Sequence, residues 1–385
     1  MNPNGTLGKR LTSLDALRGM NLFFLVAFGP VVMSFCQAVP AGHFDALLTP
    51  LTHLLTHEDW EGLTPWDLIM PLFMFMSSAS IPFSMAAFRR EHNYKGFARR
   101  LAKRVVLLWL IGMVVQGGAL NLDPDHIYLY TNTLQSIAAG YTIAALFFMF
   151  GRVRSQIAGF VLLLLLYWGA MEFIGFDGFG HGLYDKTNNL AEYIDRAVLG
   201  RFRDGASVLP DGTIDFPASY TYTWVLSTLT FGATSISGLL CGTLCKSAKY
   251  TDLKKVGILL ASGAACAALG WLWHLELPVI KHIWTSSMVL VATGYSLLLM
   301  GLFYWWYDYR GQTCGREFFR TYGLNSIVAY FLEEVINFKC IPHSLFHGLE
   351  QYIGDFYPCL LALGQAVIIY VILVAMRRLN IFVKV

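Results

Sequence analysis

Ten stretches of mostly apolar residues, each close to the length that crosses a membrane, run through the whole chain. A helix needs roughly 20 apolar residues to cross about 30 Å of hydrocarbon. The stretches cover residues 17–39, 65–88, 102–120, 131–150, 157–176, 220–245, 256–274, 284–306, 323–338 and 357–376. They are continuous rather than alternating, which excludes a transmembrane barrel. The pattern predicts an all-α, polytopic membrane helix bundle with about ten transmembrane helices.

Composition agrees with a chain that lies in a bilayer. Of 385 residues, 56% are hydrophobic and only 14% are charged, whereas a soluble domain carries about 25% charge. Too few charged side chains remain to cover a surface that faces water. This excludes a soluble enzyme, a disordered chain and a nucleic-acid binder with a basic face. We expect residues 1–385 to form a single integral-membrane domain.

Basic residues are sorted to one side of the predicted bundle, with the densest cluster at residues 89–104. Short basic loops stay cytoplasmic, so both termini are predicted to be cytoplasmic and the number of spans to be even. A site for a phosphate-bearing ligand or an anionic lipid is the alternative explanation of this cluster.

The longest predicted outer loop covers residues 177–219. Within it, Leu190, Ile194 and Val198 recur every four residues. That spacing predicts a short amphipathic helix over 189–199 lying at the membrane interface.

Cysteine and histidine spacing gives no support for a metal site, and none is expected. No CxxC pair is present, and the i,i+4 pair His53 and His57 lacks the HExxH pattern of zinc enzymes. Cys340 and Cys359 flank one predicted outer loop and could pair as a disulfide.

The segment HEDWEGLTPWD at residues 57–67 places one imidazole beside several carboxylates, just outside the second predicted span. Carboxylates stabilise a protonated imidazole and so favour a role for His57 in proton transfer. A solvated loop histidine is the alternative. Asp67 also suits the third position of a helix that Thr64 caps and Pro65 begins.

Residues 13–19, at the cytoplasmic mouth of the first span, are also too polar for their depth. Asp15 and Arg18 are i,i+3 neighbours and can form a local ion pair. Alternatively, Arg18 faces an anionic ligand that enters from the cytosol.

Polar residues also occur within predicted spans. Asn325, Ser326, Glu333 and Glu334 lie in the ninth span, and Gln135 near the outer start of the fourth is a weaker example. Ionisable groups in a membrane usually face a bundle interior or a cavity. In a continuous helix, Glu333 would lie about 15 Å along its span. These residues either line a cavity or pair within the bundle.

In this order along the chain, the polar segments resemble the transmembrane acetyltransferase family that includes heparan-α-glucosaminide N-acetyltransferase and its bacterial relatives. The matching pieces are RLTSLDALRG at 10–19, HEDWEGLTPWDLIMP at 57–71, LQ at 134–135, YIDR at 193–196 with LG at 199–200, and YGLNSIVAY at 322–330. The block at 57–71 is the more specific, because other membrane acyltransferase-like families share the SLDALRG motif.

The resemblance implies a bundle of ten or eleven helices, often a homodimer, in a bacterial inner membrane. It implies that acetyl-CoA binds from the cytosol and that an amino sugar or glycan is acetylated on the far side. His57 matches the family's essential histidine, and Asp67 is the second expected catalytic residue. The expected cofactor contacts are Arg18, Gln135, Asn325 and Ser326.

In such a reaction His57 is either the general base that deprotonates the acceptor amine or the carrier of the acetyl group. Acetyl-CoA in the cytosol and His57 outside would be separated by about one bilayer core, so a tunnel must connect them. Two other functions fit the sequence: a small-solute transporter with Glu333 and Glu334 as proton relay, and an O-acyltransferase of surface polysaccharide.

Three departures from the family pattern concern the expected acceptor pocket. A family asparagine near the outer end of the first span falls at Gly29, a glycine in the second is replaced by Ser78, and a Pro-Glu-Gly is replaced around residues 222–224. We therefore expect the acceptor pocket to differ.

Overall fold

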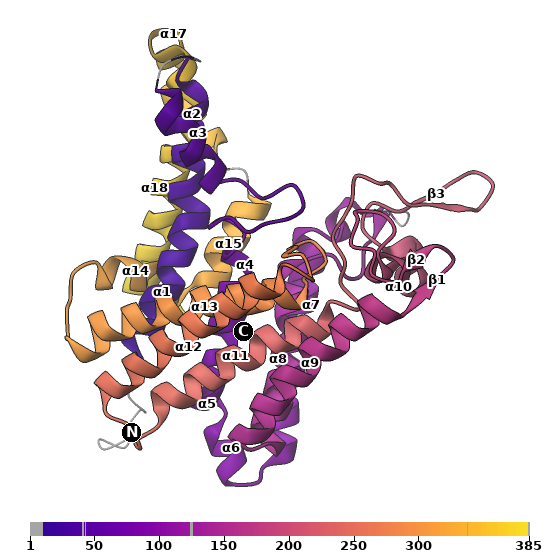
Figure 1. The fold of residues 1–385 in the computed structure, drawn as a ribbon. Coiled ribbons are helices and arrows are strands. Elements are labelled where there is room, and N and C mark those ends of the chain that lie inside the picture. Colours follow the sequence, from indigo (N-terminus) through magenta and orange to yellow (C-terminus); the bar gives the residue numbers. More distant parts are fainter. Residues whose placement is uncertain (1–10, 41, 43, 124–125, 337, 384–385) are drawn as a thin grey trace. The chain divides into compact units, whose positions relative to one another are not determined.

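The computed structural model describes residues 11–40, 42, 44–123, 126–336 and 338–383 (Figure 1). Arg10, the first residue of the RLTSLDALRG match, lies outside the described residues. Helices dominate, and the only strands among the described residues form two short antiparallel pairs. These are β1 (Gly175–Phe176) with β2 (Phe179–Gly180), and β3 (Ser207–Val208) with β4 (Ile214–Asp215). The predicted all-helical class is confirmed.

Seven helical segments in the described part of the chain are long and apolar enough to cross a membrane. They are Thr12–Ala38, Thr133–Phe150, Val153–Phe173, Thr228–Lys246, Asp252–Trp273, Ser286–Tyr309 and Cys340–Arg378. Each overlaps one of the ten predicted stretches. The total of ten spans and the cytoplasmic placement of the termini stay predictions.

The other three predicted stretches take different forms. Residues 65–88 are divided among α4 (Ile69–Ala79), α5 (Ile81–Ser84) and α6 (Ala86–Arg90). Residues 102–120 fall largely in the 22-residue helix α7 (Tyr94–Val115), whose first half is strongly basic.

The predicted stretch 323–338 contains a break in its helix. The chain breaks at Asn325 (φ −123°, ψ 43°), between α14 (Arg316–Leu324) and α15 (Ser326–Val335). The Asn325 side chain donates to the carbonyl of Ile381 at 3.0 Å and accepts from the N–H of Val383 at 3.0 Å. The ten residues of α15 extend only about 15 Å, roughly half of a hydrocarbon core.

The chain folds into two compact units, and the single-domain organisation stays a prediction. The first unit contains residues 59–63 and 70–301. Its helix α11 (Thr228–Lys246) packs against α8 (Thr133–Phe150) and α9 (Val153–Phe173). Gly238 and Gly242 form a GxxxG pair, and a Cβ at either would lie 2.1 Å from a carbonyl oxygen of α4. Close backbone contact of this kind is typical of membrane helices.

The helix predicted near residue 190 corresponds to α10 (Leu190–Leu199), whose N-cap Asn189 accepts from the N–H of Glu192 at 2.9 Å. Glu192 forms a buried ion pair with Arg203 at 2.6 Å. Asp195 accepts the backbone N–H groups of Trp224 and Val225 at 2.8 and 2.9 Å. The bonds of Asp195 hold α10, and with it the long loop between α9 and α11, beside the start of α11. Whether α10 lies at a membrane interface stays a prediction.

The remaining helices of the first unit are η2 (Ala119–Asn121), η4 (Gly200–Phe202), α12 (Asp252–Trp273) and most of α13 (Ser286–Phe303).

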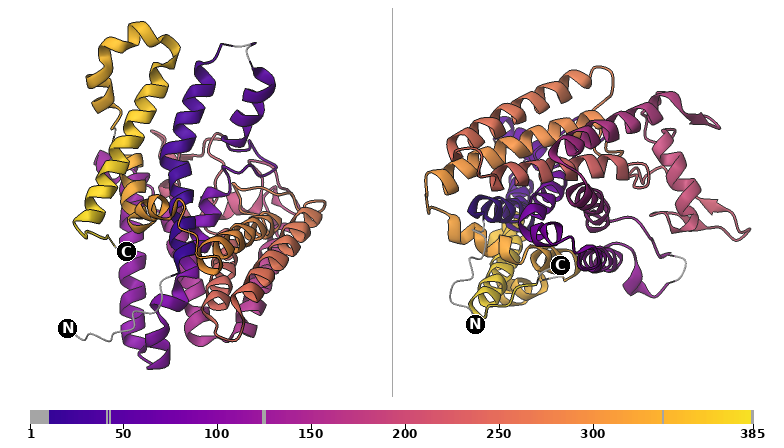
Figure 2. Two further views of the ribbon diagram at one scale, coloured as in Figure 1. Left: turned by 90° about the vertical axis from the view of Figure 1, so that its left-hand side faces the viewer. Right: turned by 90° about the horizontal axis from the view of Figure 1, so that it is seen from below.

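The second unit contains residues 9–58, 64–69 and 302–385. A continuous helix runs through α1 (Thr12–Phe23), the π-helical turn η1 (Phe24–Phe28) and α2 (Gly29–Ala38). Helix α18 (Tyr357–Arg378) lies beside α2 (Figure 2), and α14 packs against α1. A Cβ at Gly19 would meet the carbonyl oxygen of Phe319 at 1.7 Å, so these two backbones are in direct contact. The other elements are α3 (Asp45–Leu54), η5 (Tyr304–Tyr309), α16 (Cys340–Phe346), η6 (His347–Leu349), α17 (Glu350–Ile353) and η7 (Gly354–Phe356).

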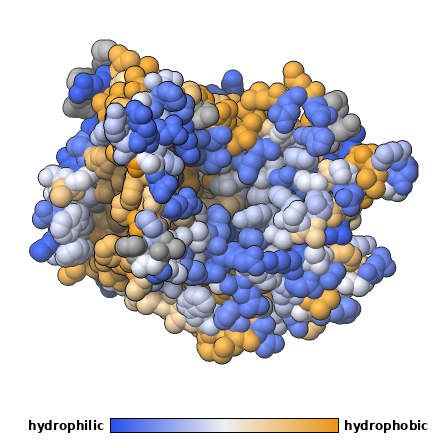
Figure 3. Space-filling model, turned by 90° about the horizontal axis from the view of Figure 1, so that it is seen from above, coloured by the Kyte–Doolittle hydropathy of each residue, from blue (hydrophilic) through white to orange (hydrophobic). Residues whose placement is uncertain are grey.

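Several helices carry large apolar side chains on their exposed faces. On α9 these include Ile157, Val161 and Leu165, and on α18 Leu363, Val367 and Val371. Hydrophilic side chains interrupted by apolar ones cover the face drawn in Figure 3. Apolar ridges along helices of spanning length belong in hydrocarbon, so the chain is an integral membrane protein.

The structure does not join Cys340 to Cys359 by a disulfide.

Candidate active site

The carboxylate of Asp67 lies against the imidazole of His57. The Nδ1 atom of His57 is 2.6 Å from Oδ1 of Asp67. The Asp67 side chain is 1% exposed, whereas that of His57 is 44% exposed. Both residues belong to the second unit. The structure thus gives a nearly buried carboxylate that holds a half-exposed imidazole.

The second oxygen of Asp67 binds backbone. Oδ2 accepts from the N–H of Glu58 at 3.2 Å and from the N–H of Thr64 at 3.1 Å, while the Thr64 hydroxyl oxygen accepts from the N–H of Asp67 at 3.3 Å. This reciprocal pattern is a capping box, although the α-helix itself begins only at Ile69. Asp67 therefore contacts the His57 ring with one carboxylate oxygen and caps the following turn with the other; its catalytic role stays a prediction.

The arrangement fixes which nitrogen of His57 can act as a base. A carboxylate beside Nδ1 favours the tautomer in which Nδ1 carries the proton, so the lone pair resides on Nε2. Because Asp67 is nearly buried and bonded through both oxygens, it restricts rotation of the ring. A base oriented by a third group is the arrangement typical of nucleophilic and acyl-transfer chemistry.

The neighbours of His57 are also engaged. His53 Nε2 lies 3.2 Å from Oε1 of Glu58, and the ring centroids of His57 and Trp66 are 6.5 Å apart. A Cβ at Gly29 would lie 2.3 Å from the Trp66 indole. Trp66 thus fills the space that a larger residue at position 29 would need, which gives a structural reason for the Gly29 departure.

Asn325 and Ser326, two of the expected cofactor contacts, lie where α14 meets α15. Asn325 is buried, and its amide is bonded to the backbone of residues 381 and 383. Ser326 is half-buried at the first position of α15. Their contact with a cofactor stays a prediction, and the bonds of Asn325 show that it also fixes the chain near residue 381.

Gln135 is completely buried in the first unit. Its Oε1 accepts from the N–H groups of Thr131 and Asn132 at 2.8 and 3.1 Å, and its Nε2 donates to the carbonyl of Leu129 at 2.9 Å. These bonds assign it a capping role at the start of α8. A role in cofactor binding stays a prediction.

Arg18 is half-buried on α1, one turn after Asp15. Its predicted contact with an anionic ligand stays a prediction. The described residues include no group of three or more His, Cys, Asp and Glu side chains placed to hold a metal.

A second polar and aromatic cluster lies in the first unit. The His282 ring lies 4.2 Å from Tyr222 and 5.5 Å from Trp60 between centroids, and its Nδ1 is 2.7 Å from the Thr221 hydroxyl. Trp60, which follows His57 by three residues, donates its indole N–H to the carbonyl of Tyr184 at 2.8 Å. The cluster joins side chains from three separate segments.

A surface ion pair flanks this cluster. Lys186 Nζ lies 2.6 Å from Oδ2 of Asp59 and 6.0 Å from the centroid of the Trp60 ring. The hydrogen bond and the positive charge of Lys186 lower the pKa of Asp59 below its ordinary value. Asp59 is therefore ionised and ties the segment after His57 to the 177–219 loop.

Comparison with known proteins finds a match to one family model and to curated proteins of one name. Residues 10–191 match a family model described as a domain of unknown function (DUF5009). Human heparan-alpha-glucosaminide N-acetyltransferase is 25% identical over 377 residues, which covers 86% of this chain and 53% of the human protein. The mouse enzyme of the same name is 26% identical over 328 residues, covering 73% of this chain and 49% of the mouse protein.

The chain is a distant relative of the heparan-alpha-glucosaminide N-acetyltransferases. It spans about half the length of the curated relatives that it matches. The resemblance inferred from the motifs is thereby confirmed.

Sequence reasoning missed two groups of side chains. Trp60, Tyr222 and His282 are far apart in the chain, and no spacing rule connects them. Arg316 and Arg320, which line a pocket with Thr12 and Asp15, were explained by topology alone. Their i,i+4 spacing places them on one helix face. This spacing was the one feature of the sequence that could have indicated a shared site.

Proposed function

We propose that this protein is a membrane acetyltransferase that transfers the acetyl group of cytosolic acetyl-CoA to the amine of an amino sugar or glycan on the extracytoplasmic side. The observation that carries the proposal is the His57–Asp67 pair, with its 2.6 Å contact and its nearly buried carboxylate. The distant kinship with N-acetyltransferases supports the reaction type. The same proposal places the protein in a bacterial inner membrane, as a candidate homodimer.

In the proposed reaction His57 is the general base. The neutral amine attacks the thioester carbonyl, a C–N bond forms, and the C–S bond breaks to release the CoA thiolate. Nε2 of His57 takes the proton that the nitrogen loses, and Asp67 stabilises the resulting imidazolium through Nδ1–H. The imidazolium then returns its proton to the thiolate or to water, which restores the base.

The aromatic cluster around Trp60 supports a sugar as acceptor. Half-buried aromatic rings offer apolar faces to the C–H faces of a pyranose, while neighbouring polar groups bind its hydroxyls. Trp60 and Tyr222 supply such faces, and His282 and the Asp59–Lys186 pair supply the polar groups. Cofactor binding by Arg18, Gln135, Asn325 and Ser326 remains part of the proposal.

The test is acetyl transfer by purified protein in proteoliposomes. Labelled acetyl-CoA and glucosamine are supplied, and the N-acetylated product is measured by mass spectrometry. We expect His57→Ala to lower the rate by about 10²–10⁴-fold. His53→Ala is the matched control, because His53 lies four residues earlier and pairs with Glu58 instead of Asp67; its rate should stay close to that of the wild type.

Other results would contradict the proposal in identifiable ways. Equal transfer by wild type and His57→Ala would exclude His57 as the base. A product removed by mild alkali would be an ester and would favour the O-acyltransferase. Glucosamine uptake without any CoA would favour the transporter. Labelled protein formed in the absence of acceptor would show that His57 carries the acetyl group.

A further inference from the structure

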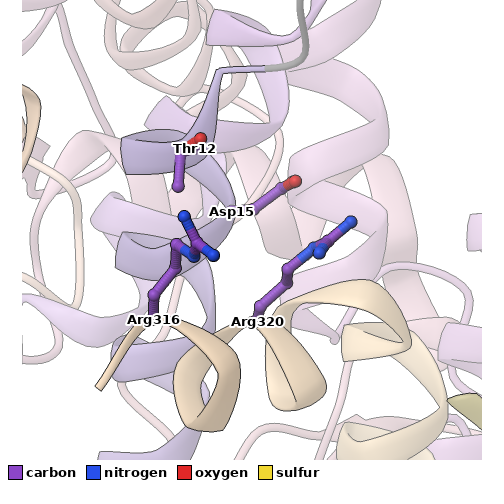
Figure 4. Close-up of a pocket in the computed structure, with 4 residues that line it drawn as sticks. All are labelled: Thr12, Asp15, Arg316 and Arg320. Atoms are coloured by element: carbon purple, nitrogen blue, oxygen red, sulfur yellow. The ribbon is translucent and has the colours of Figure 1, made fainter. Parts of the chain in front are cut away.

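A pocket lies between the first turn of α1 and the start of α14, within the second unit. Its volume is about 220 Å³, and it is lined by Thr12, Asp15, Arg316 and Arg320. Figure 4 shows Arg316 and Arg320 extending from α14 toward Thr12 and Asp15 on α1. Pockets that bind drug-sized ligands measure about 300–1,000 Å³, so this smaller pocket fits one charged group of a ligand.

The helices that carry these residues are in close contact. A Cβ at Gly323 would lie 2.3 Å from the carbonyl oxygen of Asp15, and one at Gly19 would lie 1.7 Å from that of Phe319. Helices that approach so closely cannot slide or separate without losing packing. The backbone of Arg316 and Arg320 is therefore held at a fixed position relative to that of Thr12 and Asp15.

Two guanidinium groups and one carboxylate line the pocket. Glu317 Oε1 lies 3.1 Å from Nε of Arg316 and 3.7 Å from Nη1 of Arg320, and its Oε2 accepts from Arg377. One carboxylate is thus shared by three guanidinium groups, and Asp15 is the only acidic side chain among the described residues that line the pocket. Arg316 uses only Nε in this pair, so its two terminal nitrogens have no partner among the described residues.

The backbone at the start of α1 does not supply the binding groups. Asp308 already accepts the N–H groups of Thr12 and Ser13 at 3.2 and 3.0 Å. An anion in the pocket must therefore bind to the guanidinium groups and the Thr12 hydroxyl. Guanidinium forks match the oxygens of phosphate in a bidentate manner.

We propose that this pocket binds a phosphate group, and that the phosphate belongs to the nucleotide portion of the acyl donor. The inference rests on the proposed function, which brings a phosphate-bearing donor to the cytoplasmic end of α1. Arg316 and Arg320 hold the phosphate, and Thr12 donates a hydrogen bond to it.

The test measures binding of adenosine 3′,5′-bisphosphate to detergent-purified protein by calorimetry, without acceptor or acetyl transfer. We expect the wild type to bind and the double variant Arg316→Gln/Arg320→Gln to bind at least about tenfold more weakly. Arg316→Lys keeps the charge and should bind with intermediate strength. Arg310→Gln is the matched control, because it removes an exposed arginine of the same unit that does not line the pocket.

Absence of binding by the wild type, or equal binding by the double variant, would overturn the proposal. Native mass spectrometry would also overturn the proposal if the double variant lost bound phosphatidylglycerol but retained the nucleotide. The phosphate that binds in the pocket would then be that of a lipid. If the double variant loses nucleotide binding but no acetyl transfer is ever observed, the pocket stands and the proposed function fails. If transfer occurs while the double variant binds normally, the function stands and the pocket assignment fails.

Discussion

Oδ1 of Asp67 lies 2.6 Å from Nδ1 of His57, while Oδ2 of the same carboxylate caps the turn that leads into α4. The residue that orients the proposed base is therefore itself held by backbone N–H groups. Because the cap fixes the carboxylate and the carboxylate fixes the ring, local folding of residues 57–67 determines the position of Nε2.

Asp67→Asn should lower kcat by about 10²–10⁴-fold. The amide places an N–H₂ or a neutral oxygen beside Nδ1, so the tautomer is no longer selected and an imidazolium is no longer stabilised. Steady-state acetyl transfer measures the effect, and the KM for the donor should change little. Glu58→Gln, which removes a carboxylate that pairs with His53, is the control and should change kcat by less than about twofold.

Thr64→Ala separates the two functions of Asp67. It removes the hydroxyl of the capping box but leaves the contact between Asp67 Oδ1 and His57. Loss of such a cap costs about 0.5–2 kcal/mol, so the thermal denaturation midpoint should fall while kcat falls far less than in Asp67→Asn. Equal losses of kcat in the two variants would mean that Asp67 acts only through folding.

Gly29→Asn should destabilise the protein, because a Cβ at this position would lie 2.3 Å from the Trp66 indole. Overpacking of this kind costs about 1–3 kcal/mol. The double variant Gly29→Asn/Trp66→Ala should recover a large part of the lost stability, since the indole no longer fills the space. Thermal denaturation of both single variants and the double variant measures this coupling. Strictly additive losses would contradict it.

The sequence predicted contacts that are short-range along the chain. His57 and Asp67 are ten residues apart, and the capping pattern of Thr64 and Asp67 follows directly from residue type and spacing. The apolar stretches likewise predicted the helical class, because length and hydropathy are local properties.

Contacts between distant segments could not be predicted in this way. The break at Asn325 depends on backbone groups more than 50 residues later, and the cap of α1 comes from Asp308, nearly 300 residues away. No local signal distinguishes an asparagine that interrupts a helix from one that lines a cavity. The pocket arginines were hidden for a similar reason, since the orientation rule already explained Arg316 and Arg320.

Asp195 should make the stability of the protein depend on pH. Burial raises its pKa from an ordinary value of 3.8 to about 7, against the opposing effect of the N–H groups of Val225 and Trp224. Between these two pH values, Asp195 keeps its proton in the folded protein but has lost it in the unfolded chain. The contribution of Asp195 to stability is therefore greatest below about pH 4, falls as the pH rises toward about 7, and is constant above that.

The measurement is the thermal denaturation midpoint in detergent across this pH range. Asp195→Asn carries no titratable group, so its midpoint should lack the decline between about pH 4 and pH 7. A decline of equal size in the variant and the wild type would assign the pH dependence to other residues.

Trp60→Ala should weaken binding of the sugar acceptor without removing the proposed catalytic pair. The substitution deletes the ring that lies 5.5 Å from His282 and its bond to the Tyr184 carbonyl, whereas the bonds between His57 and Asp67 do not involve it. We expect the KM for the acceptor to rise by about tenfold, as for the loss of about 1.4 kcal/mol of binding energy, while kcat at saturating acceptor changes little. Trp60→Phe, which keeps an aromatic face but loses the indole N–H, should lie between the two. A fall in kcat with an unchanged KM would show that Trp60 supports the catalytic residues rather than the acceptor.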